Sequence, residues 1–247
     1  MATQALTQAF TEQLNTQNDV MADIHAGDGN LQVDGTASPE ALASGELQYP
    51  EKMGAPTRSV TSVNGKTSLT LKAGTGGGQR WLRLPWAACN GATTWQVHLN
   101  PTLPTDLFAR SNGGNIHLNL AAMQITRVKI ENGGGNVGVI LPESAANLEV
   151  TASTGGGNVT VSVGGDTNGT NMVRAESGAG NVSVTIPAGI AVRVYATSGM
   201  GKVLMPSRIN KVGDHVYEST GYDNAVNRVD MTLKSGAGNV SVNEVIL

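Results

Sequence analysis

The sequence predicts an all-β fold, a single-domain β-solenoid or β-helix-like stack with rungs of about 22 residues. A Gly-x-Gly-Asn corner recurs at nearly constant spacing, and each corner is flanked by runs that alternate β-branched with small polar residues. Glycine accounts for 32 of the 247 residues, whereas aromatic residues make up only 4%. One repeat of this size cannot bury its own apolar side, so each rung must be stabilised by its neighbours.

The residue after the last glycine of each corner marks the period: Asn115, Asn136, Asn158, Asn181, Lys202 and Asn239. These markers are 21, 22, 23, 21 and 37 residues apart, so the last interval contains an insertion. Glycine allows a positive φ and close approach of the next rung, and asparagine bonds to nearby backbone or to a stacked amide. We therefore predict structural corners at Gly27, Gly29, Asn30, Gly114, Asn115, Gly135, Asn136, Gly157, Asn158, Gly180, Asn181, Gly201, Gly238 and Asn239.

Each repeat contains two strand-like runs. Val159, Val161 and Val163 alternate with Thr160 and Ser162, and residues 182–186 repeat the pattern. The partner runs lie at 148–151, 172–176, 190–196 and 229–233. A period of two predicts that one face of each strand is buried and the other is solvated.

The chain divides into an irregular β half (1–110) and a regular half (111–247), which we expect to form one continuous β domain. In the first half we expect a strand at 9–16, although Leu6, Phe10 and Leu14 also suit a short helix. Further strands are expected at 20–24, 31–33, 45–49, 80–84, 95–99 and 107–110, with a hairpin at 59–71 around Asn64-Gly65. In the second half, 206–225 is the insertion, and 228–234 with 239–245 are expected to form the closing rung.

Composition excludes several protein classes. The net charge is −3 without a basic stripe, so we expect no nucleic-acid partner. Cys89 is the only cysteine, which excludes an internal disulfide, and we expect an inert thiol there. No apolar run reaches about 18 residues, and the N-terminus lacks the basic start and apolar core of a secretory signal. These features predict a soluble chain without a membrane span, cytoplasmic if Met1 is the native start.

The glycine corners do not match motifs that bind phosphate or calcium. A phosphate loop needs Lys-Ser/Thr and a following helix, but Lys202 precedes Val203 and a strand. The calcium-binding repeat needs a nine-residue period and aspartate ligands. His25, His98, His117 and His215 have no partner at metal-binding spacing, and His98 and His117 are expected to face solvent. We therefore predict no catalytic, cofactor-binding or metal-binding residues, no cofactor, and no enzymatic activity.

The tryptophans cluster in the irregular half, at Trp81, Trp86 and Trp95. Packing in the core or in an end cap is the expected role. An exposed platform for a ligand is the alternative.

The order of these motifs resembles the bacterial toastrack domain over roughly residues 9–247. The resemblance is carried by GDGNL at 27–31, WQVHL at 95–99, the serial GGGNV, GAGNVSV and GMGKV corners, STGYD at 219–223, and the final GAGNVSV. This domain is the C-terminal part of LiaF- and LiaG-like proteins and is also labelled a "putative adhesin" or β-strand-repeat family. The resemblance implies a β-solenoid without enzymatic activity, tethered to membrane helices and tied to cell-envelope stress signalling. This sequence departs from that pattern because it has no membrane helix.

We expect a non-enzymatic β-solenoid interaction or scaffold module of a bacterial cell-envelope or membrane-stress-response system. Its expected partner is a protein, with a membrane-protein neighbour implied by the resemblance. The alternative is a self-assembling structural protein that forms filaments or surface fibres, because solenoid ends expose unpaired strands. Val242, Val245, Ile246 and Leu247 end the chain without a polar cap, which favours that alternative. A carbohydrate-acting enzyme would need paired carboxylates, and acidic residues are sparse in the repeat.

Overall fold

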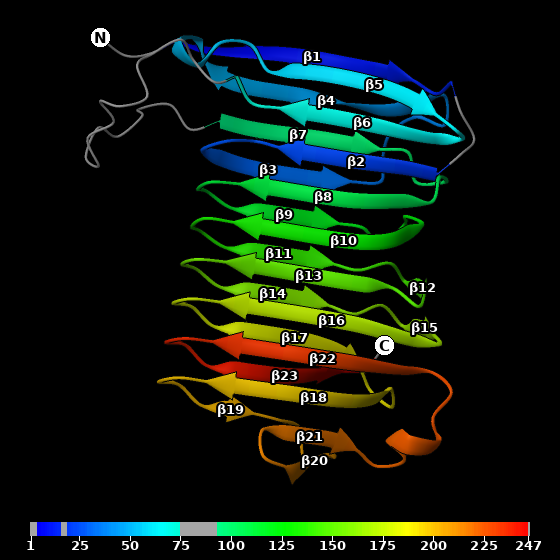
Figure 1. Cartoon of the computed structure of the whole chain (residues 1–247), viewed down its shortest axis with the longest axis vertical. Coiled ribbons are helices and arrows are strands. Elements are labelled where there is room, and N and C mark those ends of the chain that lie inside the picture. The colour runs from blue at the N-terminus through cyan, green and yellow to red at the C-terminus, as the bar shows by residue number, and fades with distance from the viewer. Residues whose placement is uncertain (1–3, 16–18, 75–92, 247) are drawn as a thin grey trace.

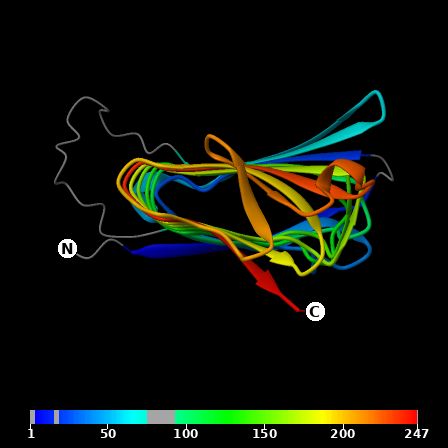
Figure 2. The same cartoon turned by 90° about the horizontal axis from the view of Figure 1, so that it is seen from below.

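The structure, a computed structural model, describes residues 4–15, 19–74 and 93–246. Two large sheets face each other along an elongated stack (Figure 1). In the regular part of the stack, each rung contributes one strand to each sheet, and a glycine corner joins the two strands. Figure 2 looks along the stack and shows successive corners superposed at one side.

Among the described residues, one sheet has ten strands and the other has eleven. In spatial order the ten-stranded sheet contains β1 (Ala5–Gln13), β4 (Ala41–Pro50), β7 (Thr93–Leu99), β3 (Gly29–Asp34), β9 (Ile116–Asn119), β11 (Val137–Ile140), β14 (Val159–Ser162), β17 (Val182–Pro187), β23 (Val240–Val245) and β19 (Val203–Leu204).

The eleven-stranded sheet contains, in the opposite direction along the stack, β20 (Ile209–Gly213), β21 (Val216–Ser219), β18 (Ala191–Ser198), β22 (Arg228–Ser235), β16 (Thr170–Ser177), β13 (Glu149–Thr154), β10 (Ile125–Asn132), β8 (Thr105–Ser111), β2 (Asp19–His25), β6 (Lys66–Lys72) and β5 (Thr57–Val63). β12 (Ser144–Ala146) and β15 (Asp166–Asn168) form a small parallel pair. β12 lies in the connection from β11 to β13, and β15 lies in the connection from β14 to β16. The short helices are η1 (Glu51–Met53) and η3 (Tyr222–Asn224).

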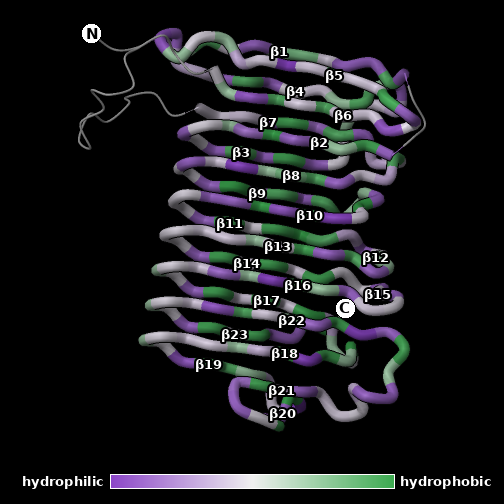
Figure 3. The backbone as a smooth tube through the Cα atoms, in the orientation of Figure 1, coloured by the Kyte–Doolittle hydropathy of each residue, from purple (hydrophilic) through white to green (hydrophobic). Residues whose placement is uncertain are grey.

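The predicted period corresponds to the spacing of the rungs. Val137, Val159, Val182 and Val240 are register partners in consecutive parallel strands, so each repeat stacks on the next without a shift. Their side chains lie in the core between the sheets. Hydrophobic and hydrophilic residues alternate along the strands (Figure 3), as the period of two predicts. The predicted all-β stack is confirmed.

The irregular half also contains the expected strands. The N-terminal run forms β1 rather than a helix, and Asn64 and Gly65 both have positive φ in the turn between β5 and β6. Trp95 is fully buried in the core, as expected for packing rather than a ligand platform. The predicted strand at 80–84, together with Trp81, Trp86 and Cys89, lies outside the described residues.

The asparagines of the corners form a ladder that runs along the stack. The Asn136 Oδ1 accepts a hydrogen bond from the Asn158 backbone N–H, and the Asn158 Oδ1 accepts one from Asn181, both at 2.9 Å. The same bond links the remaining corners, in the order Asn30, Asn115, Asn136 and then Asn181, Asn239, Lys202. The predicted amide stacking therefore takes a different form, because each side chain bonds to backbone rather than to the next amide.

A second row of hydrogen bonds lies beside the first. The residue four positions before each corner marker is Ser, Thr or Asn, and it donates to a glycine carbonyl of the neighbouring rung. Ser177 Oγ donates to the Gly157 carbonyl at 2.7 Å, and Thr154 Oγ1 donates to the Gly135 carbonyl at 2.8 Å. Ser111, Asn132, Ser198 and Ser235 make the equivalent contact. These side chains satisfy carbonyls where consecutive corners lie too close for water.

The order of the rungs in space differs from the order in the sequence. The sequence predicted that 228–234 and 239–245 form the closing rung, and this is wrong. β22 and β23 lie between the rung of β16 and β17 and the rung of β18 and β19. β23 is therefore not the outermost strand of its sheet, and β20 and β21 cover the end of the eleven-stranded sheet. The insertion allows this arrangement because it leads the chain from β19 past the end of the stack and back to β22, on the inner side of β18.

Replacement of Gly157 by alanine should destabilise the protein by about 1–3 kcal/mol or more. Gly157 has φ +141°, and a β-carbon there would lie 2.2 Å from the Gly135 carbonyl oxygen. The matched control is Gly156→Ala, because a β-carbon at Gly156 meets no atom within 4 Å. Urea unfolding of the two variants measures the difference. Equal losses of stability would contradict the role assigned to the close approach of corners.

Replacement of Asn158 by alanine should cost about 0.5–1.5 kcal/mol, because the Asn181 N–H loses its acceptor. Lys202→Ala is the control, because an ammonium group cannot accept a hydrogen bond. Its midpoint of thermal unfolding should stay close to that of the parent protein. A loss at Lys202 as large as that at Asn158 would disprove the directional ladder.

Candidate functional site

The predicted corner residues lie together along one side of the stack, but their polar groups are already bonded. The Asn Oδ1 atoms accept backbone N–H groups, and several glycine carbonyls accept side-chain donors. A ligand would have to displace bonds that hold adjacent rungs together. The corners are therefore poorly suited to bind a phosphate or a metal ion.

His98 lies in a small polar cluster rather than in open solvent. Its Nδ1 is 2.7 Å from the Asp34 Oδ1 and 2.9 Å from the Thr36 Oγ1. Burial raises the pKa of Asp34, but hydrogen bonds from Thr36 and His98 outweigh it and lower that pKa below its ordinary value. A proton relay needs the carboxylate and the hydroxyl on opposite ring nitrogens. Both contacts here share Nδ1, so the cluster fixes the loop after β3 against β7.

The remaining histidines do not form a metal centre. His117 is exposed, as expected, on the outer face of the ten-stranded sheet. In the part of the chain that the structure describes, no three His, Cys, Asp or Glu side chains are grouped closely enough to hold a metal ion.

The outer faces of the two sheets differ in chemistry. On the ten-stranded sheet, register partners on consecutive strands are His117, Gly138, Thr160, Ser183 and Ser241. On the eleven-stranded sheet, one row of register partners is Arg110, Glu131, Ser153, Glu176 and Lys234. A parallel row contains Phe108, Lys129, Thr151, Arg174, Thr232 and Tyr195. We call the surface formed by these two rows the charged face.

The charged face contains a hollow of about 870 Å³ at the small side chain of Ser153. Glu131 lies on one side of it, paired with Arg110 at 2.9 Å and with Lys129 at 2.8 Å. On the other side Glu176 pairs with Arg174 at 2.7 Å. The hydrogen bond from Lys129 and the nearby positive charges lower the pKa of Glu131 against the opposing effect of burial. The rim therefore presents fixed charges of both signs.

A second hollow of about 440 Å³ shares Arg174 with the first and extends toward β21. Met172 and Tyr195 line it and are 50% and 40% exposed, which is high for apolar and aromatic side chains in a sheet. Arg193 and Asp230 add charges at its edge. Apolar contact area beside charged groups is typical of a protein-binding surface.

The charged face was missed in the sequence, although a signal was present. The first row lies five residues before each corner marker, and the second row lies seven residues before it. Counting back from the markers would have found both rows. The charges do not form a run in the linear sequence, because most neighbours within one row are about 22 residues apart.

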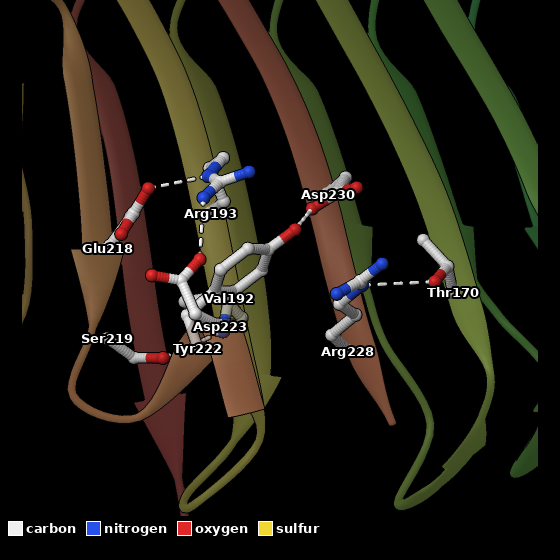
Figure 4. A network of polar contacts seen from close by, with 9 residues as sticks. All are labelled: Thr170, Val192, Arg193, Glu218, Ser219, Tyr222, Asp223, Arg228 and Asp230. Carbon is white, nitrogen blue, oxygen red and sulfur yellow. Dashed lines mark hydrogen bonds and ion pairs between the residues drawn. The ribbon is translucent and has the colours of Figure 1, made fainter. Parts of the chain in front are cut away.

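The insertion is anchored to the last rung by a polar network (Figure 4). The Tyr222 hydroxyl donates to Asp230, and Arg193 binds both Glu218 and Asp223. The Arg193 guanidinium lies 4.2 Å from the centre of the Tyr222 ring. Ser219 Oγ accepts the Val192 backbone N–H at 2.8 Å. These contacts hold β21 and η3 against β18 and β22, at one edge of the second hollow.

A family profile matches the sequence, and one solved structure shares this architecture. A sequence profile described as the N-terminal domain of toast_rack matches residues 3–162. A crystal structure of a "putative cell adhesion protein" from Clostridium sporogenes is 18% identical, with a TM-score of 0.68 over 98% of this chain and 100% of the other. A "putative adhesin" from Bacteroides fragilis is 13% identical, with a TM-score of 0.31 over 97% of both chains. No curated protein matches the sequence.

Neither short helix in the described residues has the length and hydropathy of a membrane-spanning segment.

Replacement of Tyr222 by phenylalanine should cost about 1–2 kcal/mol, because Asp230 loses a hydroxyl donor. Burial and the neighbouring Asp230 raise the pKa of Tyr222 from 10.0 to about 12. Because the pKa is higher in the folded state, the protonated Tyr222 contributes its full share to the free energy of unfolding below pH 10. This contribution is lost as the pH rises through about 12.

Urea unfolding from pH 7 to pH 11 measures this difference. The gap between the parent protein and Tyr222→Phe should be constant up to about pH 10 and then narrow. Tyr195→Phe is the control, because that side chain is partly exposed on the charged face. A difference in stability that grows at high pH would contradict the role assigned to the Tyr222 hydrogen bond.

Proposed function

The chain belongs to the family of the toast-rack N-terminal domain, and on that premise we propose that it is a non-enzymatic β-solenoid interaction module. Its proposed setting is a bacterial cell-envelope or membrane-stress-response system. We further propose that residues 1–110 and 111–247 act as one continuous β domain. In it the corner glycines and asparagines maintain the stack and do not bind a ligand.

The observation that carries the proposal is the charged face. Two adjoining hollows of about 870 and 440 Å³ lie on one face of the eleven-stranded sheet, with charges of both signs around them. The outer face of the ten-stranded sheet has mostly small uncharged side chains along the row through Thr160 and Ser183. Complementary charges give a protein interface its specificity and register. The charged face is therefore the surface proposed to bind the partner.

A protein partner fits this surface better than a nucleic acid. Glu131 and Glu176 lie between the cations of the charged face, and their carboxylates would repel a phosphate backbone. Met172, Tyr195 and Val216 supply apolar contact area in the second hollow. The Clostridium sporogenes structure of similar fold is described as a "putative cell adhesion protein", which is in keeping with a binding role. We propose a membrane protein of the cell envelope as this partner.

Site-specific photo-cross-linking in the cells that produce the protein tests the proposal. A cross-linking amino acid at Thr232 lies in the second hollow, and the same probe at Thr160 lies on the opposite sheet as a control. We expect the Thr232 probe to capture one main envelope protein and the Thr160 probe to capture none. Arg174→Glu should weaken this capture roughly tenfold, because it reverses a charge that the partner is proposed to complement.

Equal capture at the two positions, or capture that is insensitive to Arg174→Glu, would refute the charged face as the binding surface. The stress-response role has a separate readout. Cells that carry Arg174→Glu should show a weaker response of an envelope-stress reporter, at an unchanged level of the protein. A normal response together with lost capture would refute the signalling role alone.

A further inference from the structure

The end of the stack formed by β1 and β5 leaves strand edges unpaired. Among the described residues, β5 pairs only with β6 and β1 pairs only with β4. All seven residues of β5 are exposed, including Val60 at 39% and Val63 at 66%. The hairpin of β5 and β6 projects beyond the outline of the stack in Figure 2. An exposed edge of this kind is a template for another strand.

The opposite end of the stack is protected against strand addition. β20, the outermost strand of the eleven-stranded sheet there, has a shift of register between Lys211 and Gly213. β19, outermost in the ten-stranded sheet, has only two residues. Bulges, lysines and short edge strands are the features that prevent edge-to-edge pairing. The two ends therefore have different capacities for association.

The register of the hairpin determines which groups of β5 point outward. Asn64 and Gly65, with φ 50° and 78°, form a two-residue turn, so Val63 and Lys66 are paired beside it. In such a hairpin the pair that flanks the turn exchanges hydrogen bonds, and every second residue does the same. The N–H and C=O groups of Arg58, Val60 and Ser62 therefore point away from β6, toward the free edge.

We propose that two copies of this chain associate through β5, which pairs antiparallel with itself about a two-fold axis at Val60. In this register Val60 lies opposite the second copy's Val60, and Arg58 lies opposite the second copy's Ser62. The outward N–H and C=O groups of these residues are then bonded across the axis. The two eleven-stranded sheets become one continuous sheet.

The residues of β5 favour a second copy as the occupant. Arg58 is the only charged residue of β5, and Glu12 in β1 compensates it at 2.9 Å. The self-paired register therefore places no like charges opposite each other, and Val60 gains an apolar neighbour. Because a two-fold contact is closed, it produces a dimer and not a filament. One strand pair buries little area, so we expect a weak dimer.

The dimer has a consequence for the charged face, although the inference does not depend on it. The strand β5 lies at the end of the eleven-stranded sheet, several strands away from the two hollows. Both copies therefore keep their hollows accessible. A dimer would present two such surfaces and increase avidity for a clustered partner.

Sedimentation equilibrium over a wide range of protein concentration tests the proposal, with a pair of variants at one position. Ser62→Arg places two arginines opposite each other on both sides of the axis, and Ser62→Glu places glutamate opposite arginine. We expect Ser62→Arg to weaken the dimer roughly tenfold and Ser62→Glu to match or strengthen it. Salt should reduce the difference between the two variants.

A third variant tests the hydrogen bonds. Val60→Pro removes an N–H that points away from β6, so the hairpin should keep its fold while the dimer is lost. Thermal unfolding of each variant at low concentration controls for misfolding. A parent protein that stays monomeric at every concentration would overturn the proposal. A dimer equally stable in Ser62→Arg and Ser62→Glu, or growth into long particles, would also overturn it.

Discussion

The structure depends on the close approach of one glycine corner to the next. At Gly180 a β-carbon would lie 1.9 Å from the Gly157 carbonyl oxygen, and equivalent contacts recur from Gly135 to Gly238. Rungs this close leave no room for water, so each buried polar group must bond within the protein. The rows of Asn and of Ser, Thr or Asn beside the glycines supply those bonds. The corners set the register from which the parallel pairing of both sheets continues.

The same ladder explains how the stack ends. The side chain of each asparagine accepts a backbone N–H from the next rung. A rung with no neighbour beyond it therefore needs no acceptor at this position. Lys202 occupies this last position, where its backbone N–H donates to the Asn239 Oδ1 and its side chain contains no acceptor. The polar network around Tyr222 then holds β21 across the outermost rung. The end is thus closed by antiparallel strands and ion pairs rather than by another corner.

A fold maintained at its corners and core leaves the outward positions of its strands free to vary. On the ten-stranded sheet these positions along the row through Thr160 are mostly small and uncharged, and on the other sheet they form the charged face. Side chains 22 or 23 residues apart in the sequence become neighbours there, as Glu131, Ser153 and Glu176 do. The surfaces that we propose for binding are these positions and the unpaired edge at β5.

The sequence by itself determined the class of fold, the period, the corner residues and most strands, because glycine spacing and alternation reflect local conformation and burial. It determined the hairpin at Asn64-Gly65 for the same reason. Only the tertiary structure decided that β22 and β23 enter the stack one rung before its end, because the insertion is long enough for the chain to return past the last rung. It also decided that the amides bond to backbone and that outward charges converge on one face. Those outcomes depend on which rungs become neighbours, a long-range property that no single segment encodes.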